Sequence, residues 1–173
     1  MRLFIAICFP DNMKRALNRV IRKLRDEGVT GNFTRDMNMH LTLAFLGEVE
    51  AHDLPRIQEA MEDVQFSPFE IQLEGSGMFR DLLWVGTRPS PQLTAVTEDL
   101  RRSLTENGIW YDPKPFQPHI TLLRRARNLE GVPVKVQGES FTADRISLML
   151  SERIDGRLTY TELSAVSAEG KGE

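Results

Sequence analysis

The sequence predicts an α+β fold, in which two pseudo-symmetric lobes of mostly antiparallel strands with flanking helices enclose a central cleft. Three observations favour it. The order strand, helix, strand occurs twice, with the two copies 79 residues apart. A strong hairpin signal lies near the end of the chain. Finally, 173 residues, 40% of them hydrophobic and 27% charged, suffice for one substantial core. We therefore expect a single domain over residues 1–166 and a frayed, small and polar tail over 167–173.

The first copy begins with a buried strand over Leu3–Phe9, because this run is apolar and is followed by proline. Asp11 is then a good helix N-cap. Apolar residues at three- and four-residue steps predict an amphipathic helix over Asn12–Glu27. A small strand over Asn32–Arg35 leads to a longer strand over His40–Leu46, which closes the first copy.

The second copy repeats this order. Leu82–Thr87 reads as a strand, and Ser90 stands where the first copy has its capping residue. A second amphipathic helix follows and ends before the strand that begins near His119. Its apolar face consists of Leu93, Val96, Leu100 and Leu104. Matched elements at one constant shift indicate a weak internal duplication.

The remaining elements fill in the two lobes. Asp53–Val64 is predicted to be a helix with an early proline, and Phe69–Glu74 alternates like a strand. Two further strands, Arg145–Leu150 and Leu158–Leu163, are expected to pair across the turn signal Asp155-Gly156.

Each copy carries a short chemical motif in its last strand. The motifs are His40-Leu41-Thr42-Leu43 and His119-Ile120-Thr121-Leu122. On an extended strand, side chains at i and i+2 share a face, so each motif offers an imidazole beside a hydroxyl. Burial of such polar pairs is costly without partners, so a shared polar cleft explains them better than two unrelated structural histidines. Two facing pairs would clamp a phosphate.

Histidine suits the general acid and the general base of phosphodiester cleavage, because its ordinary pKa of about 6.5 lies near working pH. In the leading assignment His119 activates water and His40 protonates the leaving oxygen. The near symmetry of the cleft leaves the reverse assignment open. Thr42 and Thr121 would donate to the nonbridging oxygens. The net charge of −3 does not attract anions to the whole molecule, so phosphate binding needs a local cluster, for which Arg124, Arg125 and Arg127 are candidates.

Other ligands find less support in the sequence. Two histidines without a carboxylate or cysteine at ligand spacing make a poor metal site, so no metal is expected. A glycine-rich phosphate loop and a dinucleotide fingerprint are both missing, so no nucleotide cofactor is expected.

Several further residues have structural interpretations beside functional ones. His52 is expected to be solvated near a helix start, and Met37 and Met39 to fill core or hinge space. Trp84 and Trp110 could stack a nucleobase, with packing favoured for Trp84. Another candidate, Lys114, either reaches a phosphate or is a solvated loop residue.

The apolar run Leu3–Phe9 is far too short to cross a bilayer and lacks the flanks of a secretory signal. The single cysteine, Cys8, is expected to be a buried, inert thiol in a reducing compartment. We therefore expect a cytoplasmic protein without membrane contact, and a monomer.

At these residues the chain resembles the two-histidine phosphoesterases, most closely the RNA 2′,3′-cyclic phosphodiesterases, also called 2′-5′ RNA ligases. The matching segments are Arg2-Leu3-Phe4-Ile5-Ala6-Ile7, Met39-His40-Leu41-Thr42-Leu43-Ala44-Phe45-Leu46-Gly47-Glu48, Leu83-Trp84-Val85-Gly86 and Pro115-Phe116-Gln117-Pro118-His119-Ile120-Thr121-Leu122-Leu123-Arg124. The resemblance implies a bilobal fold and metal-independent opening of an RNA 2′,3′-cyclic phosphate to a 2′-phosphomonoester. In some members it implies ATP-independent 2′-5′ joining.

The resemblance also implies site residues. The two motif histidines would be catalytic, the two motif threonines and Arg124 would bind phosphate, and Phe45 would be a base-stacking platform. Phe45 and Arg124 each lie five residues after their histidine. Strict alternation turns position i+5 away from the histidine face, so both strands must twist or end there. Where the family commonly has a histidine before the second motif's proline, this chain has Gln117, which affects substrate contacts rather than chemistry.

Three alternatives to hydrolysis of RNA ends remain open. The same site could join RNA ends through a 2′-5′ linkage, or hydrolyse a small cyclic or ADP-ribose-type phosphate. A protein of another class, a noncatalytic module that holds RNA ends, would use the same clamp without turnover.

Overall fold

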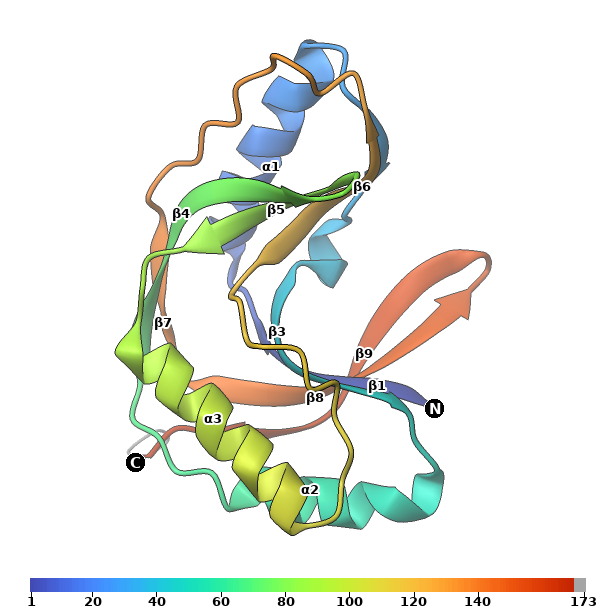
Figure 1. Cartoon of the computed structure of the whole chain (residues 1–173), viewed down its shortest axis with the longest axis vertical. Coiled ribbons are helices and arrows are strands. Elements are labelled where there is room, and N and C mark those ends of the chain that lie inside the picture. Colours follow the sequence, from blue (N-terminus) through green and yellow to red (C-terminus); the bar gives the residue numbers. More distant parts are fainter. Residues whose placement is uncertain (170–173) are drawn as a thin grey trace.

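The structure is a computed structural model that describes residues 1–169 of the chain. Two antiparallel sheets form its framework, and the predicted α+β class is confirmed (Figure 1). Helix α1 lies beside one sheet, and α2 and α3 lie beside the other (Figure 1). No helix within the described part of the chain is long and apolar enough to span a membrane.

The first sheet has four strands in the order β3-β1-β8-β9. Their bounds are β1, Arg2–Cys8; β3, His40–Glu48; β8, Arg145–Ile154; and β9, Arg157–Ser167. Strand β1 lies in the middle and pairs antiparallel with β3 and β8. The buried strand β1 therefore positions both β3 and β8.

The second sheet has five strands in the order β2-β6-β5-β4-β7. Their bounds are β2, Thr30–Phe33; β4, Phe69–Phe79; β5, Leu82–Thr87; β6, Ile120–Arg127; and β7, Ser140–Ala143. Strand β6 directly follows the second motif's histidine and pairs antiparallel with β5. In the first copy β1 pairs with β3 in the same way, so the duplication predicted from the sequence extends to strand pairing.

Three α-helices lie within residues 1–169: α1 (Asp11–Asp26), α2 (Leu54–Glu62) and α3 (Pro91–Glu106), together with the short 3-10 turns η1 (Asp36–Asn38) and η2 (Ala51–Asp53). Their buried faces reflect the predicted apolar periodicity. The prediction that Ser90 caps α3 is confirmed, since its hydroxyl accepts the N–H of Leu93 at 3.1 Å.

The prediction that Asp11 caps α1 is wrong. Pro10 occupies the N-cap position, and its carbonyl accepts the N–H groups of Met13 and Lys14. Asp11 is instead the first helical residue, where its carboxylate lies next to the positive end of the helix dipole.

Two burial predictions are also wrong. Cys8 is exposed, because β1 is buried only from Leu3 to Ile7 and Cys8 is its last residue. Its thiol nevertheless has a raised pKa, through partial desolvation and then the charge of Glu162. Met37 is 57% exposed in the η1 turn, whereas Met39, beside β3, is buried as expected.

The predicted hairpin is confirmed and is longer than expected. Strands β8 and β9 join at Asp155 and Gly156, whose φ angles of 51° and 77° are those of the two-residue turn that asparagine, aspartate and glycine favour. The hairpin projects well beyond the rest of its sheet (Figure 1). At the other end of β9, Ala168 is buried and its N–H donates to the Asp144 carbonyl at 2.8 Å. The last part of the expected tail, 170–173, lies outside the described residues.

Candidate active site

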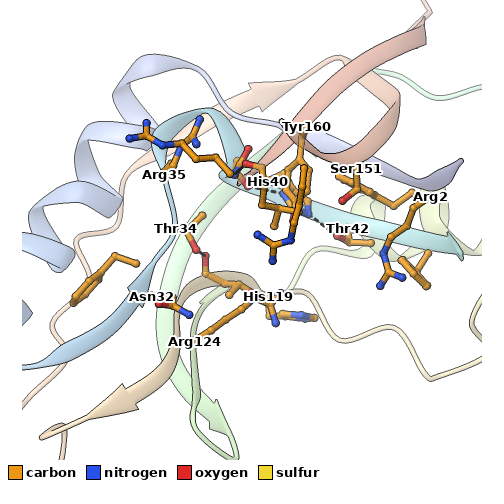
Figure 2. Close-up of a pocket in the computed structure, with 18 residues that line it drawn as sticks. Arg2, Asn32, Thr34, Arg35, His40, Thr42, His119, Arg124, Ser151 and Tyr160 are labelled. Atoms are coloured by element: carbon orange, nitrogen blue, oxygen red, sulfur yellow. Dashed lines mark hydrogen bonds between the residues drawn. The ribbon is translucent and has the colours of Figure 1, made fainter. Parts of the chain in front are cut away.

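A cleft of about 540 Å³ lies between the two sheets (Figure 2). Its walls come from β1, β2, η1, β3, β6 and the β8–β9 hairpin. All six site residues predicted from the sequence line it: His40, Thr42, Phe45, His119, Thr121 and Arg124. Residues from two distant segments of the chain therefore meet in a single cavity.

His40 is held by hydrogen bonds at both ring nitrogens. Nδ1 lies 2.7 Å from the carbonyl oxygen of Asn38, and Nε2 lies 2.8 Å from Oγ1 of Thr42. A carbonyl only accepts, so Nδ1 carries the proton in the neutral ring and Nε2 accepts from the threonine hydroxyl. The two side chains lie on one face of the strand, as the i+2 spacing predicted, and the threonine hydroxyl also orients the reactive nitrogen, a contact that the sequence did not indicate.

His119 repeats the first of these contacts. Its Nδ1 lies 2.7 Å from the carbonyl oxygen of Gln117, two residues earlier, just as Asn38 precedes His40. Nδ1 is therefore the protonated nitrogen in neutral His119, and Nε2 is left for a ligand. The two imidazoles share one tautomer.

Two aromatic rings pack against the imidazole of His119. Phe79 and Trp84 have ring centroids 5.3 Å and 6.4 Å from its own, both at steep interplanar angles. Trp84 is half-buried and packs over Gly77 of β4, where an added Cβ would overlap the indole. The interpretation of Trp84 as a packing residue is thus confirmed. Its indole packs against Gly77 and also against His119.

The pKa of His40 is lowered from 6.5 to about 4. Desolvation is the largest cause, and the charges of His119 and Arg124 add to it, whereas the hydrogen bond to Asn38 acts in the opposite direction. The rings of Phe4 and Tyr160, with centroids 4.7 Å and 5.2 Å from His40, supply much of the apolar surroundings. At pH 7 the free protein therefore holds a neutral His40.

Matching β-bulges explain why Phe45 and Arg124 face the cleft despite their odd spacing. In the pairing of β3 with β1, Ala44 is opposite Ile5 and Thr42 is opposite Ala6, so one residue between them has no partner. In the pairing of β6 with β5, Leu123 is opposite Leu83 and Thr121 is opposite Trp84, again with one residue between.

The extra residues are Leu43 and Leu122, which lie 79 positions apart like the histidines. Two consecutive residues are buried at each bulge, so the residue after them lies on the face opposite to the one that strict alternation gives it. This shift returns Phe45 and Arg124 to the histidine face. The expectation that both side chains point away from the histidine face was wrong, because strict alternation assumes that every residue of the strand is paired.

The cleft is strongly cationic. Five arginines line it, namely Arg2, Arg35, Arg124, Arg153 and Arg157, and its lining includes no aspartate or glutamate. Arg125 and Arg127 do not line it, so the predicted cluster after the second motif contributes only Arg124. The other four arginines come from separate elements, and no local run of charge marked them in the sequence.

Further residues missed by sequence reasoning lie around His40. Tyr160 and Leu158 of β9 line the cleft at alternate positions, and the Leu158 carbonyl accepts from the Asn38 amide at 2.9 Å. Alternation along the predicted strand could have placed both on one face, but not over the histidine. The remaining sequence candidates lie outside the site: His52 has 72% of its side chain exposed and Lys114 has 86%.

Paired strands from two related halves, a histidine of the same tautomer on each, and a cationic cleft between them are the features of a two-histidine phosphoesterase. The 2′-5′ RNA ligase superfamily model matches residues 9–155. The chain belongs to this superfamily.

Curated relatives extend the match. The RNA 2′,3′-cyclic phosphodiesterase of Archaeoglobus fulgidus is 33% identical over 150 residues, which cover 82% of this chain and 84% of the relative. The Escherichia coli K12 protein of the same name is 30% identical over 165 residues, covering 94% and 93%.

Solved structures agree. Escherichia coli LigT in complex with 3′-AMP superposes with a TM-score of 0.84 at 29% identity, covering 97% of this chain and 98% of the other. A Thermus thermophilus protein gives a TM-score of 0.85 at 28% identity, covering 99% and 100%. These similarities confirm the bilobal α+β fold expected from the sequence.

Proposed function

We propose that the chain hydrolyses RNA 2′,3′-cyclic phosphate ends to 2′-phosphomonoesters, with the two histidines as acid and base. The relatives that match most of the chain carry the name of this activity. The observation that carries the proposal is the matched pair of imidazoles in a cleft lined by five arginines and no carboxylate. Such a cleft fits an anionic substrate.

The reaction needs one proton taken and one given. Nε2 of His119 removes a proton from water as the water oxygen bonds to phosphorus on the side opposite O3′. The P–O3′ bond breaks, and Nε2 of His40 delivers its proton to O3′. The product keeps the phosphate on O2′ and has a free 3′-hydroxyl. Thr42, Thr121 and Arg124 stabilise the charge that builds on the nonbridging oxygens.

The acid role of His40 depends on the substrate's charge. In the free protein the lowered pKa leaves His40 neutral; desolvation is the largest cause, and the charge of Arg124 contributes. A bound phosphate anion opposes the charge of Arg124, so it raises the pKa of His40 and favours the protonated ring that acts as the acid.

The test is product analysis. Purified protein is incubated with an oligonucleotide that ends in a 2′,3′-cyclic phosphate, with and without EDTA, and ³¹P NMR identifies the hydroxyl that keeps the phosphate. We expect a 2′-phosphate and equal rates in both samples. A 3′-phosphate product would contradict the proposed bond cleavage. Tight binding without turnover would instead support the noncatalytic RNA-end module.

Joining of RNA ends is a second candidate, favoured by the description of the matched superfamily. A ribose hydroxyl would replace the attacking water, and the same two imidazoles would serve. Incubation with paired RNA halves, one ending in a cyclic phosphate and one in a 5′-hydroxyl, distinguishes the two reactions by the length of the product.

A further inference from the structure

Trp110 is exposed over 62% of its surface, although its indole is the largest apolar side chain in the connection between α3 and β6. This connection is fastened to the first sheet. The N–H of Asp112 donates to the Phe45 carbonyl at 2.9 Å. Arg101 donates to the carbonyls of Leu43 at 3.0 Å and Lys114 at 2.8 Å. Trp110 is thus presented to solvent from an anchored segment.

Trp110 lies beside Phe45, which lines the active-site cleft. A Cβ atom placed on Gly47 would be 3.5 Å from Cζ3 of Trp110 and 3.7 Å from Cε1 of Phe45. Both rings therefore border the same small space, which stays open because residue 47 has no side chain. The two rings thus form an aromatic surface that continues from the cleft to its exterior.

Arg2 adds a positive charge to this surface. Its guanidinium carbon lies 4.9 Å from the centroid of the Phe45 ring, and it lines the cleft. Figure 2 shows Arg2 beyond Thr42 as seen from His40, while Arg35 lies on the opposite side. We call Arg2, Phe45 and Trp110 the exit surface, since they lead from the histidines to the outside.

We propose that the exit surface binds the nucleotide that precedes the cyclic-phosphate end of the RNA. Trp110 stacks on the base of that nucleotide, and Arg2 contacts the phosphodiester that joins it to the terminal nucleotide. Aromatic rings and arginines are the groups that bind unpaired bases and backbone in single-stranded RNA. The proposal rests on the proposed function, because it takes the cyclic phosphate to lie between the histidines.

The exit surface makes the enzyme selective for chains over mononucleotides. A cyclic mononucleotide fills only the part of the cleft next to the histidines, so it gains nothing from Trp110. An oligonucleotide gains one stacking contact, and removal of such a contact weakens binding about 5-fold to 100-fold.

The experiment compares two substrates across four proteins. Steady-state kinetics are measured with adenosine 2′,3′-cyclic phosphate and with a trinucleotide ending in a 2′,3′-cyclic phosphate. The proteins are the wild type, Trp110→Ala, Trp110→Phe and Leu163→Ala, the last removing an exposed apolar side chain that does not line the cleft. We expect Trp110→Ala to lower kcat/KM about 5-fold to 100-fold for the trinucleotide only. Trp110→Phe keeps an aromatic ring, so it should retain most of the wild-type kcat/KM for the trinucleotide. Leu163→Ala should match the wild type with both substrates.

Fluorescence separates this proposal from the proposed function. Binding of a trinucleotide with a 2′-phosphate end should quench the emission of Trp110, and the quench should vanish in Trp110→Phe, which retains Trp84. A quench in a protein that turns over neither substrate would support the exit surface and refute the hydrolysis. Equal losses for both substrates, or no quench, would overturn the exit surface. A fifth protein, Arg153→Gln, is measured with the same two substrates. An oligonucleotide-specific loss that appears in Arg153→Gln and is missing in Trp110→Ala would also overturn the exit surface, since the strand would then follow the β8–β9 hairpin.

Discussion

The carbonyl oxygen of Asn38 lies 2.7 Å from Nδ1 of His40, and it thereby sets which nitrogen of the imidazole faces the cleft. The side chain of Asn38 is buried and donates to the Leu158 carbonyl in β9 at 2.9 Å. One residue therefore ties the histidine and the projecting hairpin together. Gln117 provides the same backbone contact for His119 at 2.7 Å.

Asn38→Ala should keep the backbone contact to His40 and lose the contact to the hairpin. Loss of the hydrogen bond to the half-buried Leu158 carbonyl should lower the free energy of unfolding by about 0.5–1.5 kcal/mol, measured by urea denaturation. Asn18→Ala is the matched control, because its 2.8 Å hydrogen bond to Asp36 is exposed. Equal stabilities of the two variants would contradict the bridging role.

Replacing either cleft histidine should remove most activity. His40→Ala and His119→Ala should each lower kcat about 10²-fold to 10⁴-fold on a cyclic-phosphate oligonucleotide, because each removes one proton-transfer group. His52→Ala provides the control, since His52 is 72% exposed outside the cleft and its loss should leave kcat unchanged. A wild-type kcat in either of these two variants would contradict the proposed acid–base roles of the histidines.

The imidazole of His40 should titrate near pH 4 in the free protein, because burial lowers its pKa. Two-dimensional NMR of the ring carbons, assigned with His40→Gln, would give the value directly. Inorganic phosphate at saturating concentration should raise it, since the anion opposes the charges of Arg124 and His119. An unchanged pKa with phosphate bound would remove His40 as the acid and favour the reversed assignment.

The same shift predicts how stability depends on pH. His40 binds its proton less readily when folded, with a pKa of about 4 against 6.5. Its contribution to the free energy of unfolding is therefore complete above pH 6.5 and is lost as the pH falls towards 4, by on the order of 3 kcal/mol. His40→Gln should lose less stability over this window. Parallel pH profiles of the two proteins in chemical denaturation would contradict it.

Arg124 should matter to the reaction while its neighbour does not. Arg124→Gln should lower kcat about 10²-fold or more, because a charge that stabilises the phosphorane-like transition state disappears. Arg125→Gln removes the same charge one residue later, outside the cleft lining, and should stay within about twofold of the wild type. Equal losses would mean that only the overall charge of the region counts.

Local signals were sufficient to predict the repeated units and the two motif histidines and threonines, because periodicity and the paired motifs can be read from short segments. The family resemblance placed Phe45 and Arg124 in the site, although strict alternation pointed them away. Strand ends were less accurate. The strand predicted over Phe69–Glu74 continues to Phe79, and the one predicted over Asn32–Arg35 spans Thr30–Phe33. Pairing with β5 and β6 sets these ends, and pairing depends on residues far away in the chain.

What could not be predicted arises from contacts between distant segments. Arg2, Arg153 and Arg157 become part of the site only because β1, β8 and β9 share a sheet whose end opens onto the cleft. The bulges at Leu43 and Leu122 likewise follow from how neighbouring strands align. Neither residue differs in type from other apolar residues of its strand, so the break in alternation had no local signal.

A substitution at Gly77 would disturb the active site from outside the cleft. It does not line the cavity, yet any side chain there would collide with the Trp84 indole, which packs in turn against His119. Gly77→Ala should therefore displace one imidazole and leave the other in place. A position outside the cleft lining, two strands away from β6, therefore restricts which substitutions the active site tolerates.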